Sequence, residues 1–225
     1  MIVEHSDVAS HPAQASSPYQ HAVRILACIV AAADPNPIPD WEPDVVGVLR
    51  SQSRLQAMDF WMRNPDYLAD ELLTEYEHDG DPSWLKEAEA IIGSREPDLR
   101  RLPMVRYCFG AFEPLDNTLS ILLSAGLIRI ERKGNPNTRI REHFYFLLDK
   151  GKAAMSELAS LHDDLAWYQR RAELVAKIAG GVGGRALKDR QYLQQTYADT
   201  DLGEIIAPLG PKVEARLVRL KEERA

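Results

Sequence analysis

Apolar residues recur at helical spacing through most of the chain, and prolines and glycines separate the segments. The spacing predicts helices at about 18–33, 44–63, 65–79, 84–92 and 98–112. Asn64-Pro65 is a typical helix start, because a short polar side chain caps the first turn and proline fits the first helical position. Asp81-Pro82 repeats this signal, and the four prolines between positions 34 and 43 predict an extended connector.

The pattern changes between positions 114 and 158. A leucine-rich helical segment from Leu115 ends at Gly126, and residues 127–132 then alternate between apolar and charged side chains, as in a half-buried strand. Positions 134–137 read Gly-Asn-Pro-Asn, which is turn chemistry, and residues 144–147 predict a second, aromatic strand. The predicted order is therefore helix, strand, basic turn, strand and helix.

One long helix is predicted after the second strand, over about 150–179. Its apolar residues lie alternately three and four positions apart, which is a narrow seam suited to packing against one other helix, in the same chain or in a second subunit. The residues of this predicted dimerisation seam are Leu158, Leu161, Leu165, Tyr168, Ala172 and Val175. Gly180 to Gly184 predict a flexible hinge, and 185–197 and 211–224 predict two further helices.

The segment around the basic turn resembles winged-helix regulators of the MarR and PadR type. Leu122 to Ile128 matches the phrase L-x-x-x-G-L-I that ends their recognition helix. Tyr145 to Gly151 matches their phrase Y-x-L-T-x-x-G, with Leu148 in place of the usual hydroxyl. The resemblance covers about residues 98–158. It implies a recognition helix followed by a two-stranded wing, and dimerisation through helices that flank the wing.

This resemblance and the helical spacing together predict a mostly α fold. A winged helix-turn-helix with a two-stranded β wing is flanked by N-terminal helices and by the long C-terminal heptad helix. The predicted regions are a disordered tail at 1–17, an N-terminal helical region at 18–94, a winged-helix core at 95–150 and a C-terminal helical dimerisation region at 151–225. Winged helices also serve as protein-interaction modules, so the resemblance implies fold more firmly than activity.

The charge is unevenly distributed along the chain, whose formal net charge is −7. Residues 1–80 carry 13 acids and 4 bases, whereas residues 95–141 carry 5 acids and 9 bases. An acidic protein can bind DNA if its positive charge is concentrated on one surface, because affinity depends on local neutralisation of phosphates. The predicted helix-turn-helix and wing are the net-positive region, which favours double-stranded DNA as the partner.

The predicted DNA-binding residues fall into two groups. In the wing they are Arg129, Arg132, Lys133, Asn135, Asn137, Arg139 and Arg141, which can neutralise phosphates or enter the minor groove. In the helices they are Arg100, Arg101, Arg106, Asn117, Thr118 and Ser120. The alternative for the wing is a solvated hairpin whose charges prevent edge-to-edge aggregation.

The recognition helix departs from the regulator pattern, because it contains no Arg or Lys. Glu113 and Asp116 also place two negative charges at the end that would meet DNA. This composition favours either a contact made mainly by the wing or a winged helix that binds protein. The two function hypotheses are therefore a dimeric, DNA-binding transcriptional regulator and a non-enzymatic interaction subunit of a multiprotein complex, such as a chromosome-organising or defence complex.

The sequence shows few residues arranged for catalysis or metal binding. Cys28 and Cys108 lie in apolar contexts and are expected to be buried free thiols, and the six histidines show no metal-ligand spacing. We find no catalytic motif, and we expect no enzyme activity, cofactor or metal. The apolar run from Ile25 to Ala33 is too short to span a membrane, and it follows a long acidic segment rather than a short basic one. It therefore predicts a core helix in a cytoplasmic protein.

Overall fold

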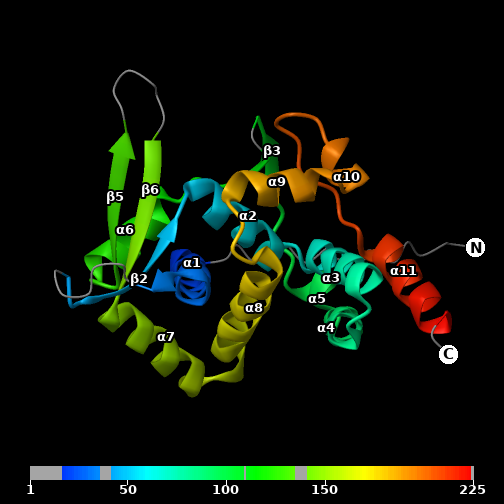
Figure 1. Ribbon diagram of the computed structural model, residues 1–225, viewed down its shortest axis with the longest axis horizontal. Coiled ribbons are helices and arrows are strands. Elements are labelled where there is room, and N and C mark those ends of the chain that lie inside the picture. Colours follow the sequence, from blue (N-terminus) through cyan, green and yellow to red (C-terminus); the bar gives the residue numbers. More distant parts are fainter. Residues whose placement is uncertain (1–16, 36–41, 109, 135–140, 224–225) are drawn as a thin grey trace, which may run out of the picture.

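The computed structural model describes residues 17–35, 42–108, 110–134 and 141–223, and it is mostly helical with a small antiparallel sheet (Figure 1). Its helices are α1 (Pro18–Ala32), α2 (Gln52–Arg63), α3 (Pro65–Asp79), α4 (Pro82–Gly93), α5 (Glu96–Leu99), α6 (Asp116–Ser124), α7 (Asp149–Leu161), α8 (Asp163–Ala179), α9 (Gly184–Tyr192), α10 (Gln195–Ala198) and α11 (Gly210–Glu222). Its strands are β1 (Asp34–Pro35), β2 (Val45–Arg50), β3 (Val105–Tyr107), β4 (Gly110–Phe112), β5 (Ile128–Gly134) and β6 (Arg141–Leu148).

The larger sheet has the strand order β1-β2-β6-β5, and all its described pairs are antiparallel. β5 and β6 form the predicted hairpin, with Ile128 opposite Leu147 at its base and Gly134 opposite Arg141 at its outer end. Side chains on one face of this sheet, including Ile128, Tyr145 and Leu147, are buried in the same core as α1 and α6. The prediction of paired strands after the leucine-rich helix is confirmed.

A buried charge network joins α1 and α2 to the chain segments on either side of the smaller sheet. Arg24 donates from Nε to Oδ1 of Asp59 at 2.5 Å, and both side chains are almost completely buried. Arg63, one turn further along α2, lies 2.9 Å from the carboxylate of Glu113. Its guanidinium also donates to the carbonyls of Leu102 and Pro103. The network therefore fixes where the chain enters β3 and where it leaves β4.

Helix boundaries follow local capping chemistry. Ser17 and Gln20 form a reciprocal capping box at the start of α1, and Asp81 accepts from the backbone N–H of Ser83 at the start of α4. Gly80 ends α3 in the left-handed conformation. Asn64 precedes α3 as predicted, but its side chain donates to the carbonyl of Phe60 and so closes α2 instead of capping α3.

The predicted helix at 44–63 is wrong in its first third, which is strand β2. The valines of this segment fit both helical spacing and a strand, and pairing with β6 decides in favour of the strand. The strand ends at Arg50, and the next residue, Ser51, has a positive φ of 79° and caps α2. Because residues 45–50 pair with residues far along the chain, local periodicity does not reveal them as a strand.

The predicted helix at 98–112 is also wrong. Only the short helix α5 forms there, and the chain then runs through Pro103 into the two-stranded sheet β3-β4. Residues 203–206 pair along the other side of β3. The backbone of β3 therefore makes its hydrogen bonds to neighbouring segments and not within a helix. In the described part of residues 98–115, no long support helix precedes α6. Cys108, expected to be buried, is exposed here, whereas Cys28 is buried as expected.

The long helix predicted at 150–179 is two helices, α7 and α8, which meet at His162. The backbone of His162 is extended, and its Nδ1 accepts from the N–H of Asp164, so this residue caps α8. The two helices pack against each other at an angle (Figure 1). The two aspartates after His162 are a helix-start signal, since carboxylates are favoured in the first turn of a helix.

Removing the carboxylate of Asp59 from the buried charge network is expected to cause a large loss of stability. Asp59→Asn leaves Arg24 charged and buried without a counter-charge, and we expect the free energy of unfolding to fall by about 3–5 kcal/mol. Urea unfolding followed by circular dichroism measures this. Asp98→Asn is the matched control, because its ion pair with Arg95 is exposed, and it should change stability by less than about 0.5 kcal/mol. Equal effects of the two changes would contradict the role given to the network.

In the glycine-rich segment after α8, one position has no room for a side chain. A Cβ on Gly184 would overlap the backbone nitrogen of Arg54, where α9 packs against the start of α2, whereas a Cβ on Gly181 would meet nothing within 4 Å. We expect Gly184→Ala to lower stability by about 1–3 kcal/mol and Gly181→Ala to change it by less than about 0.5 kcal/mol. Thermal unfolding of both variants checks this. Equal tolerance of both would support a merely flexible hinge.

Candidate nucleic-acid interface

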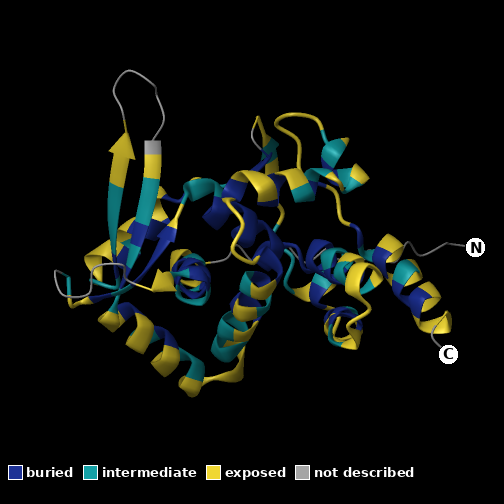
Figure 2. Ribbon diagram, viewed as in Figure 1, coloured by how far each residue is buried: buried dark blue, intermediate teal, exposed yellow. Residues whose placement is uncertain are grey.

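The hairpin β5-β6 projects from the body of the molecule (Figure 1). Its base is held by Ile128 and Tyr145, which are buried in the core, while Arg132, Lys133 and Gly134 are exposed at its outer end (Figure 2). A hairpin anchored in this way presents its outer cations to solvent.

The described cations of the hairpin differ in how far they are neutralised. Arg129, near the base, pairs with Glu42 and lies 3.6 Å from Glu131. Arg132 lies 3.8 Å from Asp116 at the start of α6, and both side chains are more than half exposed, so this pair is weak. Lys133 forms no ion pair with a described residue. Free positive charge therefore increases from the base of the hairpin outward.

One face of the sheet combines aromatic rings with cations. Phe144 and Phe146 stack with their centroids 6.3 Å apart. Lys133 and Arg50 lie 5.2 Å and 6.0 Å from the centroid of Phe144, and Arg129 lies 4.7 Å from that of Phe146. Such contacts favour a cation held over a ring face. The rings thus hold basic side chains at the sheet surface.

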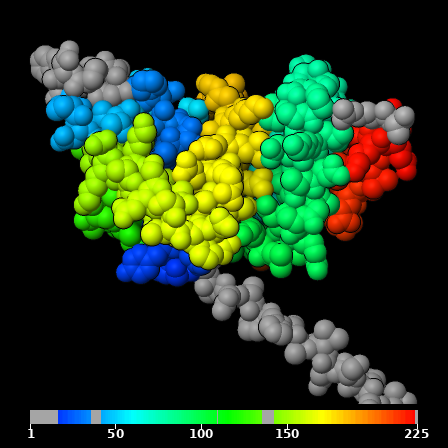
Figure 3. All heavy atoms as spheres, turned by 90° about the horizontal axis from the view of Figure 1, so that it is seen from below, coloured from blue at the N-terminus to red at the C-terminus, as the bar shows by residue number. Residues whose placement is uncertain are grey.

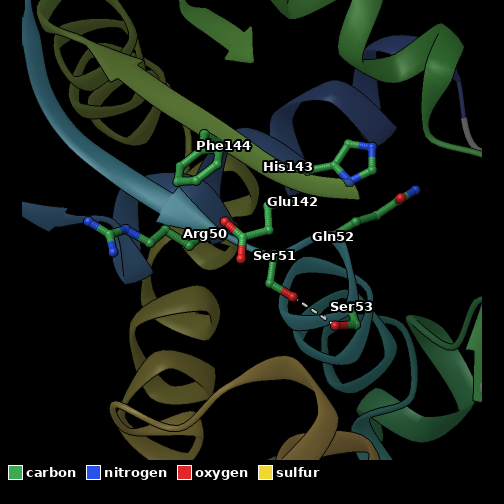
Figure 4. A pocket seen from close by; sticks show the side chains of 7 residues that line it. All are labelled: Arg50, Ser51, Gln52, Ser53, Glu142, His143 and Phe144. Atoms are coloured by element: carbon green, nitrogen blue, oxygen red, sulfur yellow. Dashed lines mark hydrogen bonds between the residues drawn. The ribbon is translucent and has the colours of Figure 1, made fainter. Parts of the chain in front are cut away.

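A cleft of about 510 Å³ lies beside this face. It is lined by the end of β2, the start of α2 and the outer part of β6: Arg50, Ser51, Gln52, Ser53, Glu142, His143 and Phe144 (Figure 4). The N–H of Ser51 donates to the carbonyl of His143 at 2.8 Å, which joins the two walls. Figure 4 shows the Glu142 carboxylate between Arg50 and Ser51, so the cleft is not a purely cationic pocket.

The predicted recognition helix, α6, offers a small polar surface. Asn117 and Ser120 are exposed, but Ser120 Oγ donates to the carbonyl of Asp116 within the helix. Thr118 is buried, which removes it from any surface that a duplex could touch. Leu123 is 42% exposed at the far end of the same helix. The described side chains of α6 thus provide few groups for reading bases.

The three arginines predicted to bind DNA ahead of α6 all bind other parts of the protein. Arg101 donates to the carbonyl of Ile206 at 2.6 Å, and Arg106 donates to the carbonyls of Ala198 and Thr200. Arg100 pairs with Asp164 and lies over the ring of Trp167. These guanidinium groups hold segments of the chain together, so the structure does not bring them to the hairpin.

The remaining predicted wing residues are only partly placed. Asn135, Asn137 and Arg139 lie outside the described residues. Arg141 is the first residue of β6, opposite Gly134, and only its backbone is described. Arg50 belongs to the same surface as Phe144, and it was missed by the sequence analysis because β2 was predicted as helix. The valine-rich run before Arg50 is the signal that pointed to a strand.

The predicted dimerisation seam is divided by the break at His162. Ala172 and Val175 on α8 are completely buried by the chain itself, where α8 packs on α1 and α2. Leu158, Leu165 and Tyr168 are half-buried, and Leu161 on α7 is 67% exposed. Figure 3 shows α7 and α8 next to each other across the lower face. Ala172 and Val175 of the seam are therefore packed completely within one chain.

Among the described residues, no group of three or more His, Cys, Asp or Glu side chains is arranged to hold a metal ion. No described helix combines the length and the apolar character needed to cross a bilayer. Comparison of the chain with protein-family models, curated proteins and solved structures finds no match. Geometry and charge are therefore the basis for assigning a function.

Proposed function

We propose that the protein is a non-enzymatic, DNA-binding winged-helix protein that grips duplex DNA mainly with the β5-β6 hairpin and acts in transcriptional regulation. The observation that carries this proposal is the projecting hairpin with unneutralised charge at its outer end. Residues 129–141 contain five bases and one acid. In the described part of that segment, only Arg129 and Arg132 form ion pairs with carboxylates.

The proposed contact is with the sugar-phosphate backbone more than with base edges. Lys133 and Arg132 are exposed and cationic, which suits phosphates, whereas α6 presents Asn117 and Ser120 beside the negative charge of Asp116. Binding of this kind depends strongly on salt and weakly on sequence. If the protein dimerises on DNA, α7 is the part of the predicted seam that remains available, through the exposed Leu161.

The role of the hairpin is tested by removing its two exposed, described cations together. We expect Arg132→Ala with Lys133→Ala to weaken binding of a duplex of random sequence about tenfold and to reduce the slope of log affinity against log salt by about 2. A mobility-shift or anisotropy titration across a salt series measures both quantities.

The matched control removes two exposed cations from α11, Arg219→Ala with Lys221→Ala, which gives the same change in net charge. It should leave the slope within experimental error of the unchanged protein. Binding that falls equally in both variants would reflect net charge alone, and unchanged binding in the hairpin variant would end the proposal.

The carboxylate of Asp116 should weaken DNA binding, because it is 85% exposed and lies beside Arg132. Asp116→Asn removes a charge that repels phosphate and releases Arg132, and we expect affinity to rise about 3–10-fold at low salt. Asp163 on α8 is also exposed, and Asp163→Asn should leave the affinity for DNA unchanged. If Asp116→Asn leaves affinity unchanged, α6 lies away from the bound duplex.

A second candidate function is that of an interaction subunit in a multiprotein complex. The specific observation in its favour is the composition of α6, which lacks a basic side chain, begins with the exposed Asp116 and exposes Leu123 near its other end. Purification of the tagged protein at low salt separates the two candidates. One stoichiometric protein partner without a shift of labelled duplex favours this second function, and a duplex shift without a partner favours the first.

A further inference from the structure

The smaller sheet has one face built of exposed apolar side chains. Val105, Tyr107, Phe112 and Ile205 are between 37% and 59% exposed, and we call them the Tyr107 face. Val105 is opposite Phe112 on one side and opposite Ile205 on the other, so their side chains point the same way. The alternate residues Met104, Ala111 and Ile206 are buried on the other face.

The Tyr107 face is held rigid before any partner arrives. Residues 203–206 run along β3, with the N–H of Arg106 donating to Glu204 and that of Ile206 donating to Met104. Arg101 and Arg106 hold the same segment from behind by donating to carbonyls of residues 198–206. The rings of Tyr107 and Phe112 pack together with centroids 5.6 Å apart. Preorganisation of this kind lowers the entropic cost of binding.

A partner strand cannot extend this sheet at β4, because side chains already occupy that edge. Tyr197 accepts from the N–H of Ala111, and Lys188 lies 3.5 Å from the carbonyl of Ala111. Gln56 makes hydrogen bonds to both the N–H and the carbonyl of Glu113. A partner is therefore excluded from the edge of β4, and the exposed apolar face remains the surface on which it can dock.

The segment that borders the Tyr107 face is acidic. Asp199, Asp201 and Glu204 are exposed, and none of them forms an ion pair with another residue in the described part of the chain. Leu202, between two of them, is 65% exposed. In a symmetric dimer that paired this patch with itself, these carboxylates would face like charges. The same charges repel the phosphates of DNA.

We propose that the Tyr107 face docks a different protein, through a surface or segment of that protein with an apolar or aromatic centre and flanking Lys or Arg. The aromatic pair fills the centre of the contact, and the three carboxylates meet the cations at its rim. This site is formed by elements other than the β5-β6 hairpin and does not depend on whether the hairpin binds DNA.

The test uses the full chain and a displayed library of random 12-residue peptides. Peptides selected on the unchanged protein, with counter-selection against Tyr107→Ser with Ile205→Ser, should be rich in aromatic or aliphatic residues together with Lys or Arg. In anisotropy titrations the selected peptides should bind this double variant at least tenfold more weakly. Both substituted side chains are exposed, so the variant should keep the thermal unfolding profile of the unchanged protein.

A second variant, Asp201→Lys with Glu204→Lys, tests the acidic rim while leaving the apolar centre intact. It should lose affinity for the same peptides and gain affinity for peptides in which Lys and Arg are replaced by Glu. Leu193→Ser is the control, because Leu193 is exposed on another part of the surface and should not matter.

Three results would overturn the proposal: selected peptides that bind the Tyr107→Ser, Ile205→Ser variant as tightly as the unchanged protein, peptides without basic residues, or a dimer in light scattering that this variant abolishes. The last would assign the face to a second copy of the chain. Duplex binding by the same variants, measured in parallel, distinguishes failure here from failure of the hairpin proposal.

Discussion

The buried pair of Arg24 and Asp59 is the contact on which the arrangement of the molecule depends. It fixes α1 against α2, and α1 in turn packs on α6, α7 and α8. Asp59 also lies 3.8 Å from Arg63, whose guanidinium reaches the segments before β3 and after β4. A buried ion pair adds little stability compared with apolar packing, but it allows few alternative arrangements of the helices that contain it. The two proposed binding surfaces are both positioned through elements that this network connects.

The parts of the fold that could be predicted from the sequence are those determined by neighbouring residues. Helices α1, α3, α4 and α11 follow from apolar spacing and from short polar or proline starts, and the β5-β6 hairpin follows from alternation around a turn. Segments that pair at long range were not predictable in this way. β2 and β3 take their hydrogen bonds from β6 and from residues 203–206, and apolar spacing within either segment fits a helix as well as a strand.

For the candidate site, the number of charges along the sequence did not show which cations are exposed. Residues 95–141 are net positive, but Arg101 and Arg106 satisfy carbonyls of the segment at 198–206 and so contribute to the shape of the protein. Arg132 and Lys133 remain at the surface, and Arg50 lies over the same Phe144 ring as Lys133, from a strand that sequence analysis did not identify. A count of charges along the chain locates a basic region, whereas only the folded structure separates cations that are exposed from those that are used internally.

The pairing of β2 with β6 has a consequence for how the chain acquires its structure. Arg50 is opposite Phe144 and Val45 is opposite Leu148, so most of the protein must be synthesised before the central strands can meet. Contacts between residues so far apart in sequence slow folding, and a growing chain leaves the valine-rich strand unpaired until its partner leaves the ribosome. During that interval the edge of β2 that will pair with β6 is open to aggregation or to capture by a chaperone.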